Sequence, residues 1–305
     1  MWGPATISDP VTGAAAAVPA LFLSDTPAGE ADLIARASLG WLRVTESPFL
    51  LMTACPSLQV LALQWLPLQR PASVIWQPLL HLVQNRCQFD LERAGTERQQ
   101  EFIATRLAAH TLLESMLLSP PGSPANWLQR GVDRAPRWPE RVIGSLSHSC
   151  HYAVVVASSA LSVAAVGIDI ERCISPQQTR VISPCLLSVA ELQRLQSWCA
   201  EGAGSAVLAS MPVEQRMCWL MTLVFSAKES LFKALFPTVQ QYFDYREADI
   251  VAFDDISCVL QLQRDLGPTG RSGQCFRLGW QCHWPAADML VSWLVVPATG
   301  LDQVG

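Results

Sequence analysis

Two lysines and a neighbouring carboxylate are the first side chains of this 305-residue chain that could perform chemistry. Lys228 and Lys233 are its only lysines, although Lys and Arg together number 21, and they flank Glu229 in one short segment. Lysine offers a compact charge suited to one phosphate oxygen or to proton transfer, whereas arginine offers a planar fork. Chance use of lysine in an arginine-rich chain is the alternative. Their clustering favours a site that needs an ammonium group.

A pair of carboxylates, Asp169 and Glu171, follows an apolar run with the pattern of a β-strand. Side chains alternate between the faces of a strand, so both carboxylates are expected on the same face. Two adjacent carboxylates repel each other, and a shared cation, a shared proton or exposure to water would explain them. Oxygen ligands at this spacing suit Mg²⁺, whereas an exposed sheet edge with two acids is the alternative. Glu229, on one charged turn of an otherwise apolar segment, favours the metal site.

Hydrophobic periodicity predicts the helices that position these groups. Residues 96–118 have helical spacing and end at a proline-rich stretch. A second helix is predicted over 212–235, ending just before Pro237 because proline disfavours a helical residue before it. Glu229 and Lys233 are four residues apart and therefore share a face of that helix.

The remaining elements are expected to be a further helix and several strands. Ser188 and Glu191 have the spacing of a capping box, which predicts a helix from there through Cys199, followed by a flexible segment over 201–210. Residues 41–83 are expected to form short strands and loops. Alternation predicts a hairpin of two strands and then three or four antiparallel strands. These strands are predicted over 152–157, 161–170, 249–253, 257–263, 274–281 and 289–296.

The order of these elements indicates an α+β protein with antiparallel sheets packed against helices. We expect two similar halves with a pseudo-two-fold relation and the active site between them. Residues 1–40 are predicted to be a partly ordered extension, 41–160 the N-terminal half and 161–298 the C-terminal half.

Composition restricts the class of partner and the location. The net charge is −5 and the pI about 5.5, so no global basic field attracts nucleic acid or an anionic membrane. The apolar stretch over 11–23 is too short to span a bilayer, and Asp9 rather than a basic residue precedes it. Ten scattered cysteines without a Cys-x-x-Cys pair are typical of buried thiols in a reducing compartment. We therefore expect a cytoplasmic protein.

A third segment, residues 137–148, ends in Gly144-Ser-Leu-Ser-His148. A lone histidine is more often structural than catalytic. Arg137 and Arg141, which precede it, would allow the segment to bind phosphate.

Together the three segments resemble the 4'-phosphopantetheinyl transferases of the surfactin/enterobactin type. That family shows Ser-x-Ser-His, then Gly-x-Asp-x-Glu, then Trp-x-x-Lys-Glu-x-x-x-Lys, which appear here as residues 145–148, 167–171 and 225–233. Arg106 in its predicted helix and the Arg-Trp-Pro run at 137–139 are similar to the enterobactin synthetase component D branch. The order and spacing of three motifs make this resemblance specific. Phe225 replaces the usual Trp, and His110 stands where that branch often has a second Arg.

The resemblance implies a Mg²⁺-dependent enzyme that transfers the 4'-phosphopantetheine moiety of coenzyme A to a serine of an apo acyl, aryl or peptidyl carrier protein. The other product would be 3',5'-adenosine bisphosphate. Asp169, Glu171 and Glu229 would hold Mg²⁺, with Glu229 also the candidate base and Lys233 stabilising the leaving group. The residues implied to bind coenzyme A are Arg106, Arg137, His148, Lys228 and Lys233.

The resemblance also implies a carrier-protein partner and a place in siderophore, enterobactin-like or other nonribosomal peptide or polyketide synthesis. A monomer is expected, because one chain can build the site between its own halves. A catalytically weak homologue that binds carrier proteins or coenzyme A is the alternative. The full set of three acids and two lysines argues against it. Another phosphotransferase is less favoured, because no Walker-type loop is present.

Overall fold

The structure is a computed structural model of the whole chain. It describes residues 42–45, 57–65, 76–120, 122–202, 204–267 and 270–298. The extension predicted for residues 1–40 lies outside these described residues.

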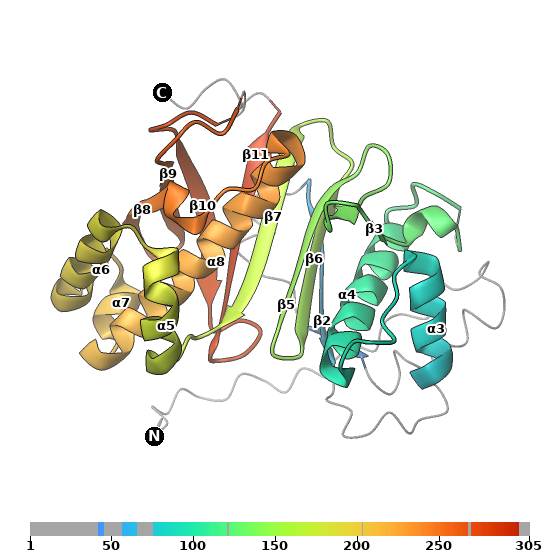
Figure 1. Cartoon of the computed structure of the whole chain (residues 1–305), viewed down its shortest axis with the longest axis horizontal. Coiled ribbons are helices and arrows are strands. Elements are labelled where there is room, and N and C mark those ends of the chain that lie inside the picture. Colours follow the sequence, from blue (N-terminus) through green and yellow to red (C-terminus); the bar gives the residue numbers. More distant parts are fainter. Residues whose placement is uncertain are drawn as a thin grey trace.

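An antiparallel four-stranded sheet and two helices form the N-terminal half (Figure 1). The strand order is β1-β2-β6-β5. One core unites both helices with the sheet and includes Trp65, Trp76, Ile103 and Val155. The elements are β1 (Leu42–Thr45), β2 (Gln59–Trp65), α3 (Trp76–Cys87), α4 (Thr96–Ser115), β5 (Ile143–Ser149) and β6 (Tyr152–Ser158). The turn η2 (Pro124–Asn126) and the two-residue strands β3 (Gln129–Arg130) and β4 (Pro136–Arg137) connect α4 to β5.

An antiparallel five-stranded sheet in the order β7-β11-β10-β9-β8 forms the C-terminal half. The long helix α8 packs on this sheet, and α5, α6 and α7 lie around α8 (Figure 1). Gly167 allows the closest approach, because a Cβ there would lie 1.9 Å from the Ser230 carbonyl oxygen of α8. The strands are β7 (Val163–Arg172), β8 (Ala248–Phe253), β9 (Ser257–Leu262), β10 (Cys275–Cys282) and β11 (Met289–Pro297). The helices are α5 (Pro176–Leu186), α6 (Val189–Glu201), α7 (Ala206–Ser210) and α8 (Val213–Val239), followed by the turn η3 (Tyr245–Glu247).

These two helix-covered antiparallel sheets confirm the predicted α+β class. Edge strands β5 and β7 lie side by side where the halves meet (Figure 1). The Ile168 backbone N–H donates to the Ser145 hydroxyl oxygen across this junction at 3.1 Å. Behind it a third core brings Val154 and Val156 of β6 against Ile168 and Ile170 of β7. Strand β7, which carries Asp169 and Glu171, is thus fixed against strand β5, which carries Ser147 and His148.

The predicted hairpin between the strands now called β6 and β7 is wrong. Strand β6 pairs with β2 and β5, whereas β7 pairs with β11, for example Asp169 opposite Ser292. The short link after Ser158 joins two sheets rather than two strands of one sheet. Hydrophobic alternation identified both strands, but it carries no information about their hydrogen-bonding partners.

Three local predictions also need correction, and one strand was not predicted. The helix α3 occupies part of the segment expected to hold only strands and loops, because Pro78 lies in the first turn, where its missing N–H costs nothing. Residues 143–149, for which no element was predicted, form strand β5. The segment 201–210 contains helix α7, which Ser205 caps. Helix α8 continues through Pro237 to its end at Val239.

In the described ranges, none of the helices combines the length and apolar character needed to cross a membrane.

Candidate active site

Strand β7 presents Asp169 and Glu171 toward serines of β5. The Ser147 hydroxyl donates to Asp169 Oδ1 at 2.7 Å, and the Ser149 hydroxyl donates to Glu171 Oε2 at 3.2 Å. The prediction that both carboxylates share a face is therefore confirmed. The alternating serines of β5 follow the same period of two as the acids, so each reaches one carboxylate.

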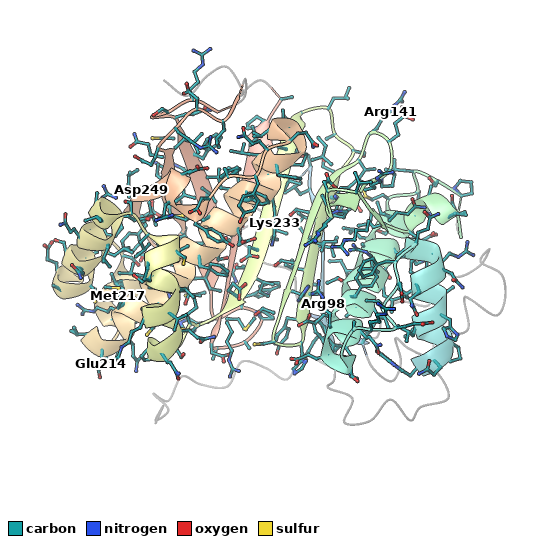
Figure 2. The ribbon with its side chains drawn as sticks, viewed as in Figure 1. Arg98, Arg141, Glu214, Met217, Lys233 and Asp249 are labelled. Carbon is teal, nitrogen blue, oxygen red and sulfur yellow. The ribbon has the colours of Figure 1, made fainter. Side chains whose placement is uncertain are left out.

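Lys233 brings helix α8 to this strand. Its ammonium donates to Asp169 Oδ1 at 2.6 Å, to the Ile168 carbonyl oxygen at 3.2 Å and to the Ser147 hydroxyl at 3.1 Å. Lys233 lies near the middle of the molecule, where the halves meet (Figure 2). Asp169 is 2% exposed, and its Oδ2 has no hydrogen-bond partner in the described structure. The carboxylate therefore keeps one buried oxygen for a further positive group.

Glu171 lies in an environment that disfavours its charge. Burial, followed by the repulsion of Asp169, raises its pKa to about 8, although Lys233 and the Ser149 hydroxyl act in the opposite direction. A further cation beside this carboxyl group would favour its anionic form.

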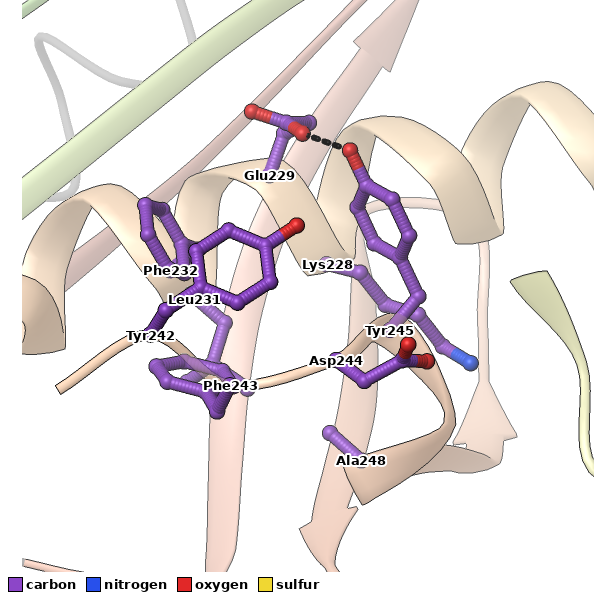
Figure 3. Close-up of a pocket in the computed structure, with 9 residues that line it drawn as sticks. All are labelled: Lys228, Glu229, Leu231, Phe232, Tyr242, Phe243, Asp244, Tyr245 and Ala248. Carbon is purple, nitrogen blue, oxygen red and sulfur yellow. Dashed lines mark hydrogen bonds between the residues drawn. The ribbon is translucent and has the colours of Figure 1, made fainter. Parts of the chain in front are cut away.

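Glu229 projects from the same helix as Lys233 but does not pair with it. Its Oε1 accepts a hydrogen bond from the Tyr245 hydroxyl, in the turn η3 (Figure 3). Burial and the Glu229 carboxylate both raise the pKa of Tyr245, so the phenol remains the donor. Glu229 and Lys233 thus make separate contacts, Glu229 with Tyr245 and Lys233 with Asp169. No sequence signal pointed to Tyr245, because it belongs to a different segment.

Lys228 precedes Glu229 on α8, and its side chain points in a different direction (Figure 3). It is 2% exposed, and its ammonium donates to Glu191 Oε2 at 2.6 Å and to the Leu186 carbonyl oxygen at 2.8 Å. This buried pairing gives no support to the predicted coenzyme A contact of Lys228. The predicted capping box is also only half formed. Ser188 caps α6, but the Glu191 side chain turns inward to Lys228 and to the Ile250 N–H.

His148, on β5, faces helix α4. Arg98 Nη1 lies 3.1 Å from His148 Nε2, and Glu101 Oε1 lies 3.8 Å from His148 Nδ1. Arginine has no acceptor, so Nε2 accepts this hydrogen bond and the ring proton is on Nδ1, toward Glu101. Burial lowers the pKa of His148, and the charges of Arg98 and Lys233 lower it further, against the raising effect of Glu101. Arg98 was missed in the sequence, although it lies two turns before Arg106 on the same predicted helix.

Arg106 is buried on α4 among cations rather than carboxylates. Its guanidinium lies 4.6 Å from the centroid of the Phe102 ring, and its Nε has no hydrogen-bond partner in the described structure. Burial lowers the pKa of Arg106, and nearby Arg130 and Arg98 lower it further, whereas Cys87 raises it. Such a group of guanidinium ions attracts an anion.

Arg137, which was predicted to bind coenzyme A, and His110, which departs from the pattern of the branch, lie outside this grouping. Arg137 is exposed on β4, and no hydrogen bond or ion pair of its side chain to the site residues is found in the described structure. His110 is buried and stacks on Trp127, with ring centroids 4.2 Å apart. The departure at His110 is thus accounted for by packing.

A cleft of about 760 Å³ lies between the halves. Its walls include Glu101 and His148 from the N-terminal half and Glu171 and Arg172 from the C-terminal half. The motifs therefore meet where the sequence predicted the active site, between the halves.

The expected metal ligands are only partly assembled. Among the described residues, no group of three or more His, Cys, Asp or Glu side chains is arranged to hold a metal ion. Glu229 contacts Tyr245 instead. Two features nevertheless fit a cation at Asp169 and Glu171: the buried, unpartnered Asp169 Oδ2 and the repulsion that raises the Glu171 pKa. A divalent cation would relieve both.

Comparison with known proteins agrees with the motifs. Residues 87–158 match a family model described as the 4'-phosphopantetheinyl transferase N-terminal domain, and residues 165–276 match one described as the 4'-phosphopantetheinyl transferase superfamily. Enterobactin synthase component D of Escherichia coli K12 is 30% identical over 212 residues, which cover 69% of this chain and 84% of that protein.

Other relatives match over shorter segments. The chain spans about half (51%) of the enterobactin synthase component D of Salmonella typhimurium, at 34% identity over 145 residues, or 47% of this chain. The 4'-phosphopantetheinyl transferase Svp of Streptomyces mobaraensis is 29% identical over 202 residues, which cover 65% of this chain and 72% of that protein. The convergent motifs and the match to the Escherichia coli protein show that the chain belongs to the 4'-phosphopantetheinyl transferase superfamily.

Proposed function

We propose that this chain transfers the 4'-phosphopantetheine moiety of coenzyme A to a serine of an apo acyl, aryl or peptidyl carrier protein and releases 3',5'-adenosine bisphosphate. The observation that carries the proposal is the cleft between the halves, which is lined by His148 from β5 and Glu171 from β7. Glu171 on one wall lies beside the buried Asp169, and His148 on the other wall contacts Arg98.

Asp169 and Glu171 would hold Mg²⁺, with Glu229 as the third ligand or as the base. The ion would neutralise negative charge on the pyrophosphate of coenzyme A. The buried Asp169 Oδ2 without a partner supports this assignment. Lys233, which already bonds Asp169, would stabilise the leaving phosphate as a compact charge.

The phosphates at the adenosine end would bind the cations of α4 and β5. The assignment of Arg106 to phosphate binding is supported by the surroundings of its buried guanidinium. The charges that shift the pKa of Arg106 include other arginines but no carboxylate. Arg98 joins the predicted set, because it contacts His148 directly. Arg137 remains a weaker candidate, since it is exposed, and Lys228 loses its support, since it is buried against Glu191.

The carrier partner and pathway rest on the relatives. Several of them bear the name enterobactin synthase component D, so we propose carriers of siderophore or other nonribosomal peptide synthesis. One chain supplies both walls of the cleft, which supports a monomer. The nine cysteines in the described ranges are unpaired, which is consistent with a cytoplasmic location.

A carrier panel tests the proposal. The protein, coenzyme A and Mg²⁺ are incubated with apo acyl, aryl and peptidyl carriers, and intact mass is recorded. We expect one added phosphopantetheine per carrier and no addition to a carrier whose serine is replaced by alanine. Bound coenzyme A without any mass gain would instead favour the weak binding homologue. Binding of neither coenzyme A nor metal would contradict the assignment of the site.

A further inference from the structure

A second cavity, with a volume of about 390 Å³, lies within the C-terminal half. The end of β7, the start of α5, the first turns of α8 and the loop between β10 and β11 enclose it. Most of its lining side chains are apolar, such as Ile174, Met211 and Leu290, and three cysteines are among them. None of the side chains assigned to the transfer reaction lines it. The size and the apolar lining of this cavity are typical of a site for a small molecule.

Cys282 is the thiol of this cavity that has a histidine as its partner. Of the other two thiols, Cys218 is buried, and Cys173 is hydrogen-bonded to Thr222. Cys282 is the last residue of β10, is half-buried and is hydrogen-bonded to His283. His283 itself is exposed and lines the same cavity. Cys282 is therefore the thiol of this group that combines access to the cavity with a titratable neighbour.

The imidazole of His283 is both oriented and charged. Its Nδ1 donates to the Ala287 carbonyl oxygen at 2.6 Å, across the loop that joins β10 to β11. The hydrogen bond with Cys282 raises the pKa of His283 to about 9, against the lowering effect of burial, so the ring is charged at neutral pH. The thiolate is the nucleophilic form of a cysteine, and an adjacent imidazolium favours that form. The pair thus suits a nucleophilic sulfur with a proton donor beside it.

Trp219 gives the cavity a hydrogen-bond donor without a partner. It lines the cavity and is 6% exposed, and its indole Nε1 has no hydrogen-bond partner in the described structure. An indole N–H only donates, so a ligand that satisfies it has to bring an acceptor such as a carbonyl oxygen. The apolar lining favours an uncharged ligand. The thiol, the unpartnered donor and the lining together point to an apolar electrophile that carries a carbonyl group.

We propose that Cys282 is the nucleophile of a modification site that takes small, uncharged α,β-unsaturated carbonyl compounds into this cavity. In the step, the Cys282 sulfur, as the thiolate, forms a bond to the β-carbon of the ligand. The π electrons of the carbon–carbon double bond move toward the carbonyl oxygen, to which Trp219 Nε1 donates. The α-carbon then takes one proton from the His283 imidazolium, so the thiol and the double bond together become a thioether. The addition has no leaving group and needs no oxidant.

Two maleimides of one reactive group test the proposal. N-phenylmaleimide is uncharged, and N-(4-carboxyphenyl)maleimide carries the same unsaturated carbonyl ring with an added carboxylate. Each is given to the folded full chain at less than one equivalent at pH 7, and the rate of addition at each cysteine is followed by mass spectrometry of peptides. Cys150 is the internal control, because it is exposed and lies in the cleft rather than in this cavity. The variants are His283→Gln, Cys282→Ser and, as their matched control, Cys150→Ser.

We expect Cys282 to be the first cysteine that N-phenylmaleimide labels in the wild type. The charged reagent should label Cys282 about tenfold more slowly or less, because burying an unpaired carboxylate in an apolar cavity is unfavourable. Both reagents should label Cys150 at similar rates. His283→Gln should slow the addition at Cys282 by about tenfold or more, because the amide cannot supply the positive charge. Cys282→Ser should lose the fast addition, and Cys150→Ser should keep it.

Three results would overturn the proposal: first labelling at an exposed cysteine such as Cys150, equal rates of the two reagents at Cys282, or an unchanged rate at Cys282 in His283→Gln. The first two are measured on the wild type alone, so they decide the matter even if a variant fails to fold. The measurement requires neither coenzyme A nor a carrier. Its outcome is therefore independent of whether the proposed transfer takes place.

Discussion

Replacing Lys228 by methionine should destabilise the protein strongly without removing any group from the cleft. Lys228 and Glu191 are 2% and 0% exposed, and their charged atoms lie 2.6 Å apart. Removing the ammonium leaves the Glu191 carboxylate buried with only the Ile250 N–H and deprives the Leu186 carbonyl oxygen of its donor. Breaking one side of such a buried pair costs about 3–5 kcal/mol. That loss is a large part of a typical stability of about 5–15 kcal/mol.

The assay is equilibrium unfolding in urea, with Arg172→Met as the matched control. Arg172 and Asp288 also lie 2.6 Å apart, but their side chains are 62% and 43% exposed. An exposed pair contributes about 0–1 kcal/mol, so the two variants separate burial from distance. The double variant Lys228→Met/Glu191→Gln should recover most of the lost free energy of unfolding, because the amide is neutral and can still accept from Ile250.

Equal losses in Lys228→Met and Arg172→Met would refute this reasoning. So would a double variant that is as unstable as Lys228→Met alone, since the penalty would then not arise from an unpaired Glu191.

Three further outcomes are expected. Burial lowers the pKa of His110 from 6.5 to about 4, so the unfolded chain binds a proton that the folded chain does not, and lowering the pH from about 7.5 to about 5 should reduce the free energy of unfolding by about 2 kcal/mol. Urea titrations of the wild type and of His110→Gln at both pH values measure this loss. An identical pH dependence of the two proteins would contradict it. Arg106→Gln should raise the Kd for coenzyme A by about tenfold or more and weaken the salt dependence of that Kd, because a charged hydrogen bond contributes about 1.5–3 kcal/mol. Calorimetry measures both quantities. An unchanged affinity would show that Arg106 does not bind coenzyme A. Mg²⁺ should raise the melting temperature of the wild type but not of Asp169→Asn, since binding to the folded state alone stabilises it; an equal shift in both would place the ion elsewhere.

Much of the candidate site could be predicted from residue types and spacing. The two acids of β7 share a face because strand side chains alternate, and their contacts with Ser147 and Ser149 confirm that face. The helices near 96–118 and 212–235 followed from periodicity. The α3 helix and strand β5 were missed, because a proline in the first turn and polar serines hide the local pattern.

The sequence by itself determined the family, the α+β class and the acids, lysines and histidine of the three motifs, because these depend on side-chain chemistry at fixed spacing. Only the tertiary structure decided that Lys233 contacts the acids of β7 and that Lys228 is buried in the core. Five residues along a helix correspond to a rotation of about 140° between side chains, so Lys228 and Lys233 cannot share a face. The face of α8 that meets Asp169 is set by the position of β7, which pairs with β11 and lies beside β5. These contacts between distant segments leave no local pattern, and they bring Lys233 to Asp169 while Glu191 takes Lys228 into the core.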